Sequence, residues 1–286
     1  MNIAIVGCGT IFKYVYHGIK KNPNYKLVAL CDQEINRIKK FRGSYDIYTS
    51  YTAMAKNLAH DTLIVILVSH TIRANILNYF LKEKFKVICE KPLFWKKEQC
   101  TQTLWPYVLY HRAFNEKIPL IAKFINAQKS YIKSINMIYY EDISKQTTGT
   151  EYRDISDLDG GGCINDNLPN CMSVLDRIFD SPIVFKSVTK EAKNGITTKA
   201  NVNLLINNIN CDVKLSWQSQ VDEKSIIIKT NKGHYLFDLQ SGYLFGKDSL
   251  YKEYENCFNY FSFSDNSSKR TSYRILKVLD KINSIK

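Results

Sequence analysis

The chain has 286 residues, of which 45% are hydrophobic, 13% aromatic and 23% charged, so its composition is that of a folded protein with one large domain or two of ordinary size. Its formal net charge of +13 could attract nucleic acid or an anionic membrane, but the 40 Lys and Arg residues are scattered along the chain. We therefore expect a lysine-rich solvated surface, with neither nucleic acid nor membrane as a partner.

The cysteine spacing and the hydropathy pattern indicate the compartment. The eight cysteines include no Cys-x-x-Cys pair, which favours free thiols in a reducing cytoplasm over disulfides or a zinc site. No apolar run approaches the roughly 20 residues of a membrane span, and Met1-Asn2 leads into a strand with no signal-peptide pattern. We expect a cytoplasmic protein without a bound metal.

The N-terminal stretch has the order of a dinucleotide-binding unit. Asn2–Val6 is a short apolar run typical of a buried parallel strand, and the turn Gly7–Ile11 leads into a helical stretch that extends to about Lys21. A second apolar run, Lys26–Cys31, ends at Asp32. A strand, a glycine turn, a helix and a strand with an acid at its tip predict a nucleotide site.

The chemistry of this turn explains the residue types. Gly7 would permit the tight turn, and Gly9 would let the backbone approach a pyrophosphate at the helix N-terminus, where free N–H groups favour an anion. The third glycine position holds Phe12, so the fingerprint is incomplete. Asp32 can accept hydrogen bonds from both ribose hydroxyls and would repel a 2′-phosphate, which predicts NAD rather than NADP.

Strands and helices continue to alternate through about residue 115. Helices are predicted at 33–42, 53–59 and 74–84, and strands at 47–48, 62–68, 86–90 and 105–110. This alternation predicts an α/β Rossmann-type domain, 1–115, with a doubly wound parallel sheet.

The strand at 86–90 ends in Glu90-Lys91-Pro92, which places a lysine where open α/β sheets bind their ligands. The proline disfavours helical backbone at Lys91, so the lysine would be presented at the strand exit. A salt-bridged Glu–Lys pair at an ordinary strand exit is the alternative, and the motif alone does not choose between the two.

Residues 116–286 have a different pattern. An amphipathic helix is predicted at 118–130 and a basic one at 270–285, with strands at 134–140, 183–189, 199–206, 210–218, 223–230 and 234–238. Several strands alternate apolar and polar residues, and Asn207-Asn208 and Asn231–Gly233 lie at turns between them. We expect an α+β domain with a large, mostly antiparallel open sheet.

One segment interrupts the second region. Gly160-Gly161-Gly162 precedes a helix on which Asp166 and Asn170 are one turn apart, so both polar side chains share a face. A flexible loop that feeds a helix N-terminus is the alternative interpretation.

Three motifs together resemble the glucose–fructose oxidoreductase / inositol dehydrogenase family, Gfo/Idh/MocA. They are Ala4–Ile11 with the strand that ends at Asp32, the Cys89–Leu93 segment, and Gly160-Gly161-Gly162 with Asp166. The resemblance spans nearly the whole chain, and the strands of Asn201–Trp217 are similar to the family's C-terminal sheet.

The resemblance implies roles for several residues. It makes Lys91 a substrate-orienting and proton-handling residue and Asp166 a substrate ligand, whereas the family's acid/base histidine falls at Asn170. An amide can hydrogen-bond a hydroxyl but cannot take its proton at neutral pH. The expected catalytic residues are Lys91, Asp166 and Asn170, and the expected cofactor-binding residues are Gly7, Gly9, Thr10, Ile11, Asp32, Ser69, Glu90 and Lys91.

Three functions remain open on these grounds. The first is an NAD(P)-dependent oxidoreductase that transfers hydride to or from a sugar, nucleotide-sugar or cyclitol-like substrate, with Lys91 handling the proton. The second is a C=N reductase of the same family, whose chemistry does not require the histidine. The third is an NAD-binding sensor or assembly protein without catalysis. The resemblance also implies a homodimer or homotetramer formed through the exposed sheet face of the second domain.

Overall fold

The structure is a computed structural model that describes residues 1–96, 105–146, 154–240, 249–262 and 264–285. Contacts divide the described residues into two units. The first comprises 1–93, 105–109, 254–262 and 264–269, and the second comprises 94–96, 110–146, 154–240, 249–253 and 270–285. The last part of the chain therefore contributes to both units.

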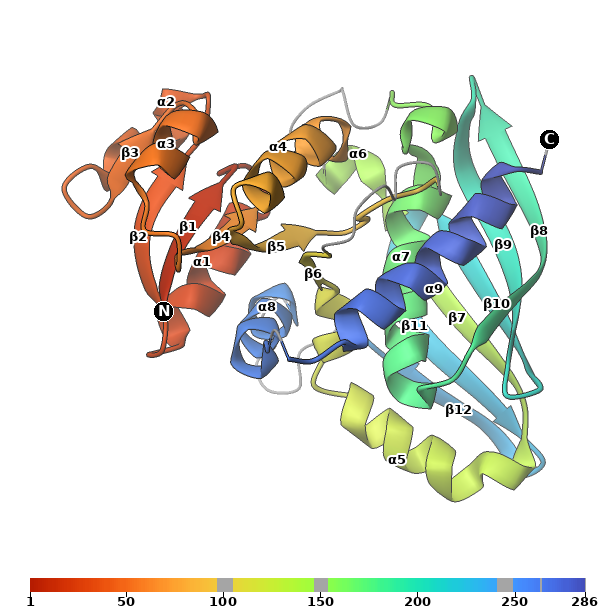
Figure 1. Ribbon diagram of the computed structural model, residues 1–286. Helices are drawn as coiled ribbons and strands as arrows, with labels where there is room; N and C mark the ends of the chain where they lie inside the picture. The colour runs from red at the N-terminus through yellow and green to blue at the C-terminus, as the bar shows by residue number, and fades with distance from the viewer. Residues whose placement is uncertain (97–104, 147–153, 241–248, 263, 286) are drawn as a thin grey trace. The chain divides into compact units, whose positions relative to one another are not determined.

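The first unit contains a parallel sheet with the strand order β3-β2-β1-β4-β5-β6 (Figure 1). Its strands are β1 Asn2–Val6, β2 Lys26–Cys31, β3 Asp46–Tyr48, β4 Leu63–Ile66, β5 Lys86–Glu90 and β6 Tyr107–Leu109. β1 and β4 are continuous apolar runs whose central residues are fully buried, because helices cover both faces of the sheet. The predicted doubly wound parallel sheet is confirmed.

The helices of the first unit are α1 Phe12–Lys21, α2 Ile35–Ile38, α3 Tyr51–Asn57 and α4 His70–Lys82, with a 3-10 turn at Lys39–Phe41. The helix predicted at 33–42 is wrong in extent, because only Ile38 buries its side chain there. α4 begins at His70 and not at residue 74. Arg73 occupies a buried position together with Ile76, Leu77 and Phe80. Because this buried residue is charged, the hydrophobic pattern does not extend into the first turn of α4, and the helix start is predicted too late.

The second unit contains a sheet with the order β12-β11-β7-β10-β9-β8. Its strands are β7 Ile132–Asp142, β8 Ile183–Lys193, β9 Ile196–Ile206, β10 Ile209–Ser216, β11 Gln218–Thr230 and β12 Gly233–Asp238. β10 and β7 pair in parallel and the remaining neighbours are antiparallel, which confirms the predicted mostly antiparallel sheet.

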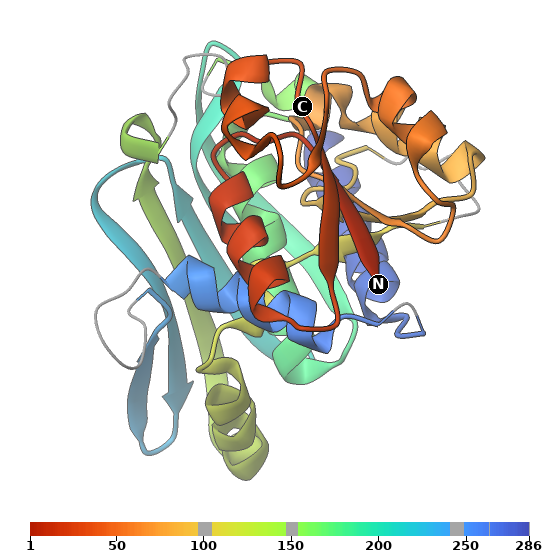
Figure 2. The ribbon, with the colours of Figure 1, turned by 90° about the vertical axis from the view of Figure 1, so that its left-hand side faces the viewer.

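Helix α7, Gly162–Phe179, lies along one face of this sheet and packs on β9, β10 and β7 (Figure 2). Helix α9, Ser267–Asn283, runs antiparallel beside it. Thr271 and Arg274 both bond the Asp176 carboxylate near the end of α7, and Asn283 donates to Asn165 Oδ1 near its start, at 3.2 Å. Since α5, Ile118–Gln128, also packs on α7, most side chains of α7 are buried.

The structure adds a helix that the sequence pattern does not reveal, α8 at Ser249–Tyr260. Its first residues belong to the second unit and those from Tyr254 onward to the first. Asn22 Nδ2 and the Tyr25 hydroxyl both donate to Phe258 O, at 3.2 and 3.0 Å, so the later part of α8 is bonded to the segment that joins α1 to β2.

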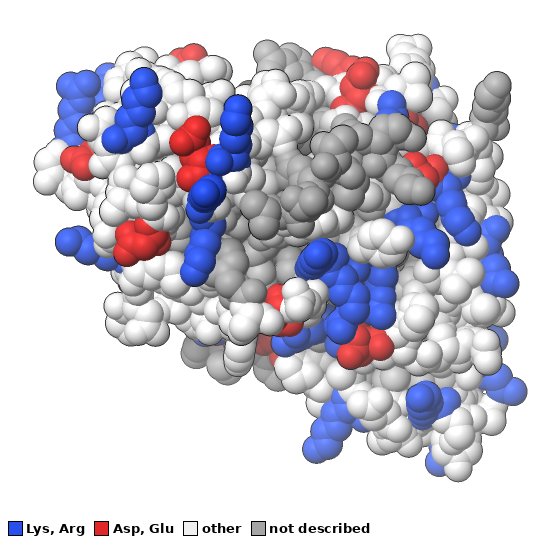
Figure 3. Space-filling view, viewed as in Figure 1, with Lys and Arg blue, Asp and Glu red and all other residues white. Residues whose placement is uncertain are grey.

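The positive charge is partly compensated where it is densest. Figure 3 shows Lys and Arg side chains gathered over α9, where Arg270, Lys277 and Lys281 are exposed. Arg270 Nη2 lies 2.8 Å from Asp180 Oδ1, so some of this charge is paired with carboxylates of the same unit. The seven cysteines within the described ranges are buried free thiols, whereas Cys100 lies outside those ranges. No helix in the described part of the chain is long and apolar enough to cross a membrane.

Gly18 provides a test of the packing of α1 on α8. A Cβ added to Gly18 would lie 2.9 Å from Tyr254 O and 3.0 Å from Phe258 Cδ2. Replacing a helical glycine by alanine ordinarily stabilises a protein by about 0.5–1 kcal/mol. Here we expect Gly18→Ala to lower the free energy of unfolding by about 1–3 kcal/mol, because a backbone carbonyl must move.

Urea unfolding of the two proteins measures this difference. Lys20→Ala, at an exposed position of the same helix, is the control and should change stability by no more than about 0.5 kcal/mol. A Gly18→Ala protein that is more stable than the wild type would contradict the close packing.

Candidate functional site

The turn after β1 is tightly packed at Gly7 and exposed at Gly9. Gly7 has φ +95°, and a Cβ at this position would lie 2.9 Å from Val68 N, so only glycine fits. Gly9 is exposed, and a Cβ there would meet no atom within 4 Å, so this side of the turn is open. Among the residues that the structure describes, no side chain caps α1, and no acidic residue lies in its first turn. The helix N-terminus, with Thr10 and Ile11 before it, can therefore receive an anion.

Asp32 is held rigidly at the tip of β2. Its Oδ2 accepts the Cys8 N–H at 2.7 Å, and its Oδ1 accepts the Glu34 N–H at 2.9 Å. Arg37 Nη1 lies 3.5 Å from Oδ2, with its side chain about half exposed. Oδ2 thus has two donors and Oδ1 has one, so Oδ1 can still accept a hydrogen bond from a ribose hydroxyl. Arg37 balances part of the charge of Asp32, and spacing alone did not reveal this contact.

The carboxylate of Glu90 turns inward at the end of β5. Its Oε1 accepts the Tyr254 hydroxyl at 2.6 Å, and its Oε2 accepts the backbone N–H of Lys91 at 3.2 Å. Burial raises the pKa of Glu90, although the Tyr254 hydrogen bond and the charges of Lys91 and Arg73 oppose this. Glu90 is thus a buried residue that shapes the strand exit rather than a surface carboxylate.

Lys91 follows at the strand exit, half-buried, with a cis peptide bond to Pro92. Arg73 donates to the carbonyl oxygens of Glu90 and Pro92, at 2.8 and 2.6 Å, so the main chain on both sides of Lys91 is held. Ser69 is exposed just before α4. The first unit therefore carries every predicted cofactor residue, on the turns and strand ends that follow β1, β2, β4 and β5.

In the second unit, the glycine run before α7 is tightly packed. A Cβ on Gly161 would lie 1.9 Å from Ile155 O, and one on Gly162 would lie 2.0 Å from Asp157 Oδ1. Asp157 in turn accepts the Thr197 N–H of β9 at 2.8 Å. Gly161 and Gly162 therefore let the chain pass close to its neighbours, where a side chain would collide.

Asp166 and Asn170 project from α7 one turn apart, as predicted, but their environments differ. Asp166 is half-exposed, whereas Asn170 is buried and its Nδ2 lies 3.3 Å from the Tyr139 hydroxyl. The Ser173 hydroxyl donates to Asn170 O at 2.8 Å. Lys91 belongs to the first unit and these two residues to the second, so their meeting in one pocket stays a prediction.

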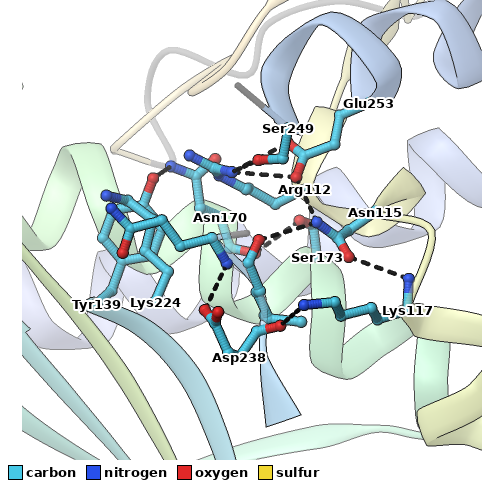
Figure 4. A network of polar contacts seen from close by, with 12 residues as sticks. Arg112, Asn115, Lys117, Tyr139, Asn170, Ser173, Lys224, Asp238, Ser249 and Glu253 are labelled. Carbon is cyan, nitrogen blue, oxygen red and sulfur yellow. Dashed lines mark hydrogen bonds and ion pairs between the residues drawn. The ribbon is translucent and has the colours of Figure 1, made fainter. Parts of the chain in front are cut away.

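A buried polar network surrounds Asn170 (Figure 4). Arg112 Nη1 donates to both carboxylate oxygens of Glu253, at 3.0 and 3.2 Å, and to Ser249 Oγ at 3.2 Å. Asn115 Nδ2 donates to Glu253 Oε1 at 2.7 Å. Burial by itself lowers the pKa of Arg112, but the Glu253 carboxylate and Tyr139 outweigh it and raise the pKa. Arg112 is therefore a permanent cation in this network.

Tyr139 lies close to two cations. The Arg112 guanidinium carbon is 5.8 Å from the centre of its ring, and Lys224 Nζ is 5.0 Å from the centre. Burial raises the pKa of Tyr139 well above its ordinary value, so its hydroxyl stays protonated. Lys224 is itself buried, 2.7 Å from Asp222 Oδ1 and 3.8 Å from Glu141 Oε2.

Two buried atoms of this network, Arg112 Nε and Asn170 Oδ1, have no hydrogen-bond partner among the described residues. The sequence analysis assigned no role to Arg73, Arg112, Tyr139, Lys224 or Glu253. Only the tertiary structure brings Arg112, Tyr139, Lys224 and Glu253 together in the second unit. Arg73 belongs to the first unit, and its buried-face position could have been suspected from its spacing to Ile76 and Phe80.

Comparison with known proteins finds a family model that is similar to the first part of the chain. The model of a family described as an oxidoreductase family with an NAD-binding Rossmann fold, Gfo/Idh/MocA, matches residues 1–105. An uncharacterized oxidoreductase of Escherichia coli (strain K12), YgjR, is 27% identical over 96 residues, which are 32% of this chain. The chain thus matches about 29% of the length of that relative. The resemblance stated from the sequence motifs is confirmed for these residues, together with an NAD-binding fold.

Solved structures extend the likeness to the whole fold. GenD2 from gentamicin A biosynthesis, in complex with NAD, has a TM-score of 0.81 at 11% identity, over 98% of this chain and 92% of its own. A putative myo-inositol dehydrogenase from Sinorhizobium meliloti 1021 has a TM-score of 0.78 at 14% identity, over 100% and 97%. D-galactose-1-dehydrogenase from Rhizobium etli reaches 0.74 at 18% identity, over 97% and 94%. At these identities the likeness is one of fold.

The Arg112–Glu253 pair can be tested by a double-mutant cycle. We expect Arg112→Met to lower the free energy of unfolding by about 3–5 kcal/mol, because it leaves the Glu253 carboxylate buried without its cation. Glu253→Met should cost a similar amount, and the double variant should cost clearly less than the sum of the two.

Urea unfolding of the four proteins measures the coupling. The exposed pair Lys199–Glu191, whose Nζ and Oε2 are 3.1 Å apart, is the control and should show a coupling below about 1 kcal/mol. Additive costs at Arg112 and Glu253 would show that the two charges do not depend on each other.

Proposed function

We propose, because residues 1–105 match the model of the Gfo/Idh/MocA oxidoreductase family, that the protein is an NAD-dependent oxidoreductase. Its substrate would be a small sugar, nucleotide-sugar or cyclitol-like molecule, and hydride would pass between a carbon of that substrate and the nicotinamide. The observation that carries the proposal is the open turn at Gly7–Gly9, with Asp32 fixed at the next strand tip and Lys91 held at the exit of β5.

The residues of the first unit fit the cofactor. The uncapped N-terminus of α1 and the exposed backbone at Gly9 and Thr10 would receive the pyrophosphate. Asp32 would accept hydrogen bonds from the ribose hydroxyls, and its carboxylate would repel a 2′-phosphate. The cofactor supplies the hydride chemistry, and the protein supplies binding, orientation and proton transfer.

Lys91 is the residue that we assign to proton transfer. Asn170 stands where the family's acid/base histidine is expected, and an amide can neither give nor take a proton at neutral pH. The unpartnered Asn170 Oδ1 can still accept a hydrogen bond from a substrate hydroxyl. In this assignment Asp166 holds the substrate and Asn170 orients it. The Lys91 side chain gives a proton to the reacting oxygen as an ammonium group, or takes that proton as a neutral amine.

The buried state of Asn170 also supports a second candidate, an NAD-binding protein without turnover that acts as a sensor or assembly partner. Its side chain is almost fully enclosed and one of its amide hydrogens points to Tyr139, as in a residue kept for packing. Purified protein that binds NADH but changes no sugar, cyclitol or imine on a broad panel would favour this candidate. We place either protein in the cytoplasm, as a homodimer or homotetramer that pairs through the second unit's sheet.

Removing the lysine tests the assignment of proton transfer. We expect Lys91→Ala to lower kcat by about 10²–10⁴-fold, the usual contribution of a positioned acid or base, with the Kd for NADH changed by less than about threefold. Nicotinamide absorbance reports turnover, and protein fluorescence reports binding. Lys86→Ala, at the exposed start of the same strand, is the matched control and should behave as the wild type. Near-normal turnover of Lys91→Ala would contradict the assignment of proton transfer to Lys91.

Replacing the acid at the tip of β2 tests the choice of cofactor. We expect wild-type protein to bind NADH more tightly than NADPH, and Asp32→Asn to weaken NADH binding by about tenfold through the loss of charged hydrogen bonds. Binding of NADPH should weaken less or improve, because the repulsion of the 2′-phosphate is gone. Asp46→Asn removes an exposed carboxylate at the edge of the same sheet and should leave both affinities unchanged. An unaltered NADH/NADPH ratio in Asp32→Asn would exclude a ribose contact.

A further inference from the structure

The side chain of Arg73 is buried in α4 and makes an unusual set of contacts. Nε and Nη2 both donate to Val68 O, at 3.3 and 2.9 Å, and Nη1 donates to Glu90 O and Pro92 O, at 2.8 and 2.6 Å. Within the described part of the chain, every hydrogen bond of this guanidinium goes to a main-chain carbonyl. Most of its N–H donors are thus used on three carbonyl oxygens.

These carbonyls belong to two segments that carry the proposed chemistry. Val68 lies in the loop after β4 and packs against the turn Gly7–Ile11, here called the cofactor turn. A Cβ on Gly7 would come within 2.9 Å of Val68 N and of Val68 Cγ1. Glu90 and Pro92 are the neighbours of Lys91 on either side. One side chain therefore joins the backbone beside the cofactor turn to the backbone on both sides of the lysine.

A planar guanidinium is suited to this task and an ammonium is not. Arginine presents its donors in a rigid fork, so it can bond carbonyls in different directions while its own geometry stays fixed. Lysine carries three donors on a flexible stem and cannot span the same three acceptors. Burying a permanent cation costs free energy, and the buried Glu90 carboxyl supplies only part of the compensation.

We propose that Arg73 is the positioning residue of Lys91, which it holds in place relative to the cofactor turn through the carbonyls of Val68, Glu90 and Pro92. The inference rests on the proposed function insofar as Lys91 handles the proton. It goes beyond that function because it names the residue that determines the position of the Lys91 ammonium group. Arg73 itself acts only through the backbone and does not contact the substrate.

The alternative is that Arg73 only stabilises the fold by connecting two loops. The two roles predict different results for a folded Arg73 variant. If Arg73 only stabilises the fold, the position of Lys91 is unchanged, whereas loss of a positioning residue displaces Lys91. Displacing a reacting group by about 1 Å can lower the rate about 10²-fold. Loss of a contact that only stabilises the fold lowers the free energy of unfolding but leaves the position of Lys91 unchanged.

The test uses Arg73→Lys and Arg73→Met, with Arg42→Met as the matched control, because Arg42 has an exposed side chain in the same unit. Three measurements are made on each folded protein with NADH bound. They are kcat and KM across pH, the rate at which Lys91 is acetylated by acetic anhydride across pH, and hydrogen exchange of the segments 66–72 and 88–95.

We expect Arg73→Met to lower kcat by about tenfold to a hundredfold, with a smaller change in KM and less than about a threefold change in the Kd for NADH. The pH profile of Lys91 acetylation should shift, and hydrogen exchange should rise in both segments together. Arg73→Lys should show the same changes at smaller size, which keeps the test decisive where Arg73→Met does not fold. Arg42→Met should match the wild type in all three measurements.

The proposal is overturned if a folded Arg73 variant keeps the wild-type acetylation profile of Lys91, or if exchange rises at only one of the two segments. Its failure can be told from failure of the proposed function. Normal turnover of Lys91→Ala removes the catalytic role of the lysine, whereas acetylation and hydrogen exchange still decide whether Arg73 holds it. A large kcat effect in Arg73→Met with an unchanged Lys91 would mean that Arg73 acts on something other than the lysine.

Discussion

The close approach of Val68 to Gly7 is the contact on which the candidate site of the first unit depends. Gly7 has a backbone conformation that other residues rarely adopt, and it lacks the Cβ that would collide with the loop after β4. Because this loop can settle against the cofactor turn, Val68 O is placed where Arg73 reaches it. Arg73 also bonds the backbone on both sides of Lys91 at the exit of β5. The loop against the cofactor turn and the backbone around Lys91 are therefore held by the same side chain.

Buried charge is handled differently in the two units. In the first, the cation of Arg73 is satisfied by carbonyl oxygens, and burial favours the protonated form of Glu90, whose hydrogen bond comes from Tyr254. In the second, Arg112 is paired directly with Glu253, and Lys224 lies close to Glu141. A buried charge without such partners costs several kcal/mol. These contacts therefore restrict the arrangements that the surrounding segments can adopt.

The environment of Asn170 bears on how the proposed chemistry is divided. Its amide cannot exchange a proton, and the phenol beside it stays protonated because burial raises the pKa of Tyr139 far above neutrality. Neither group is a base at physiological pH. In the proposed function, Asp166 and Asn170 of the second unit are therefore assigned to orienting the substrate, and proton transfer is assigned to Lys91 of the first unit.

Much of the fold could be predicted because its signals are local. The apolar runs of β1 and β4, the glycine turn with Asp32 beyond it, and the alternating strands after residue 132 depend on neighbouring residues, and hydrophobic periodicity reports such patterns directly. The start of α4 was misplaced because a charged residue, Arg73, occupies its buried face, and α8 was missed altogether.

The sequence by itself determined the fold class, the nucleotide turn, and the positions of Lys91, Asp166 and Asn170 in their elements. Only the tertiary structure decided what surrounds them. The Glu90 carboxyl group turns inward to Tyr254, Arg73 bonds the backbone beside Lys91, and both Arg112 and Lys224 lie close to the ring of Tyr139. The physical reason is distance along the chain. These contacts join residues from separate elements, and their strength depends on burial and direction, which no local pattern of residue types encodes.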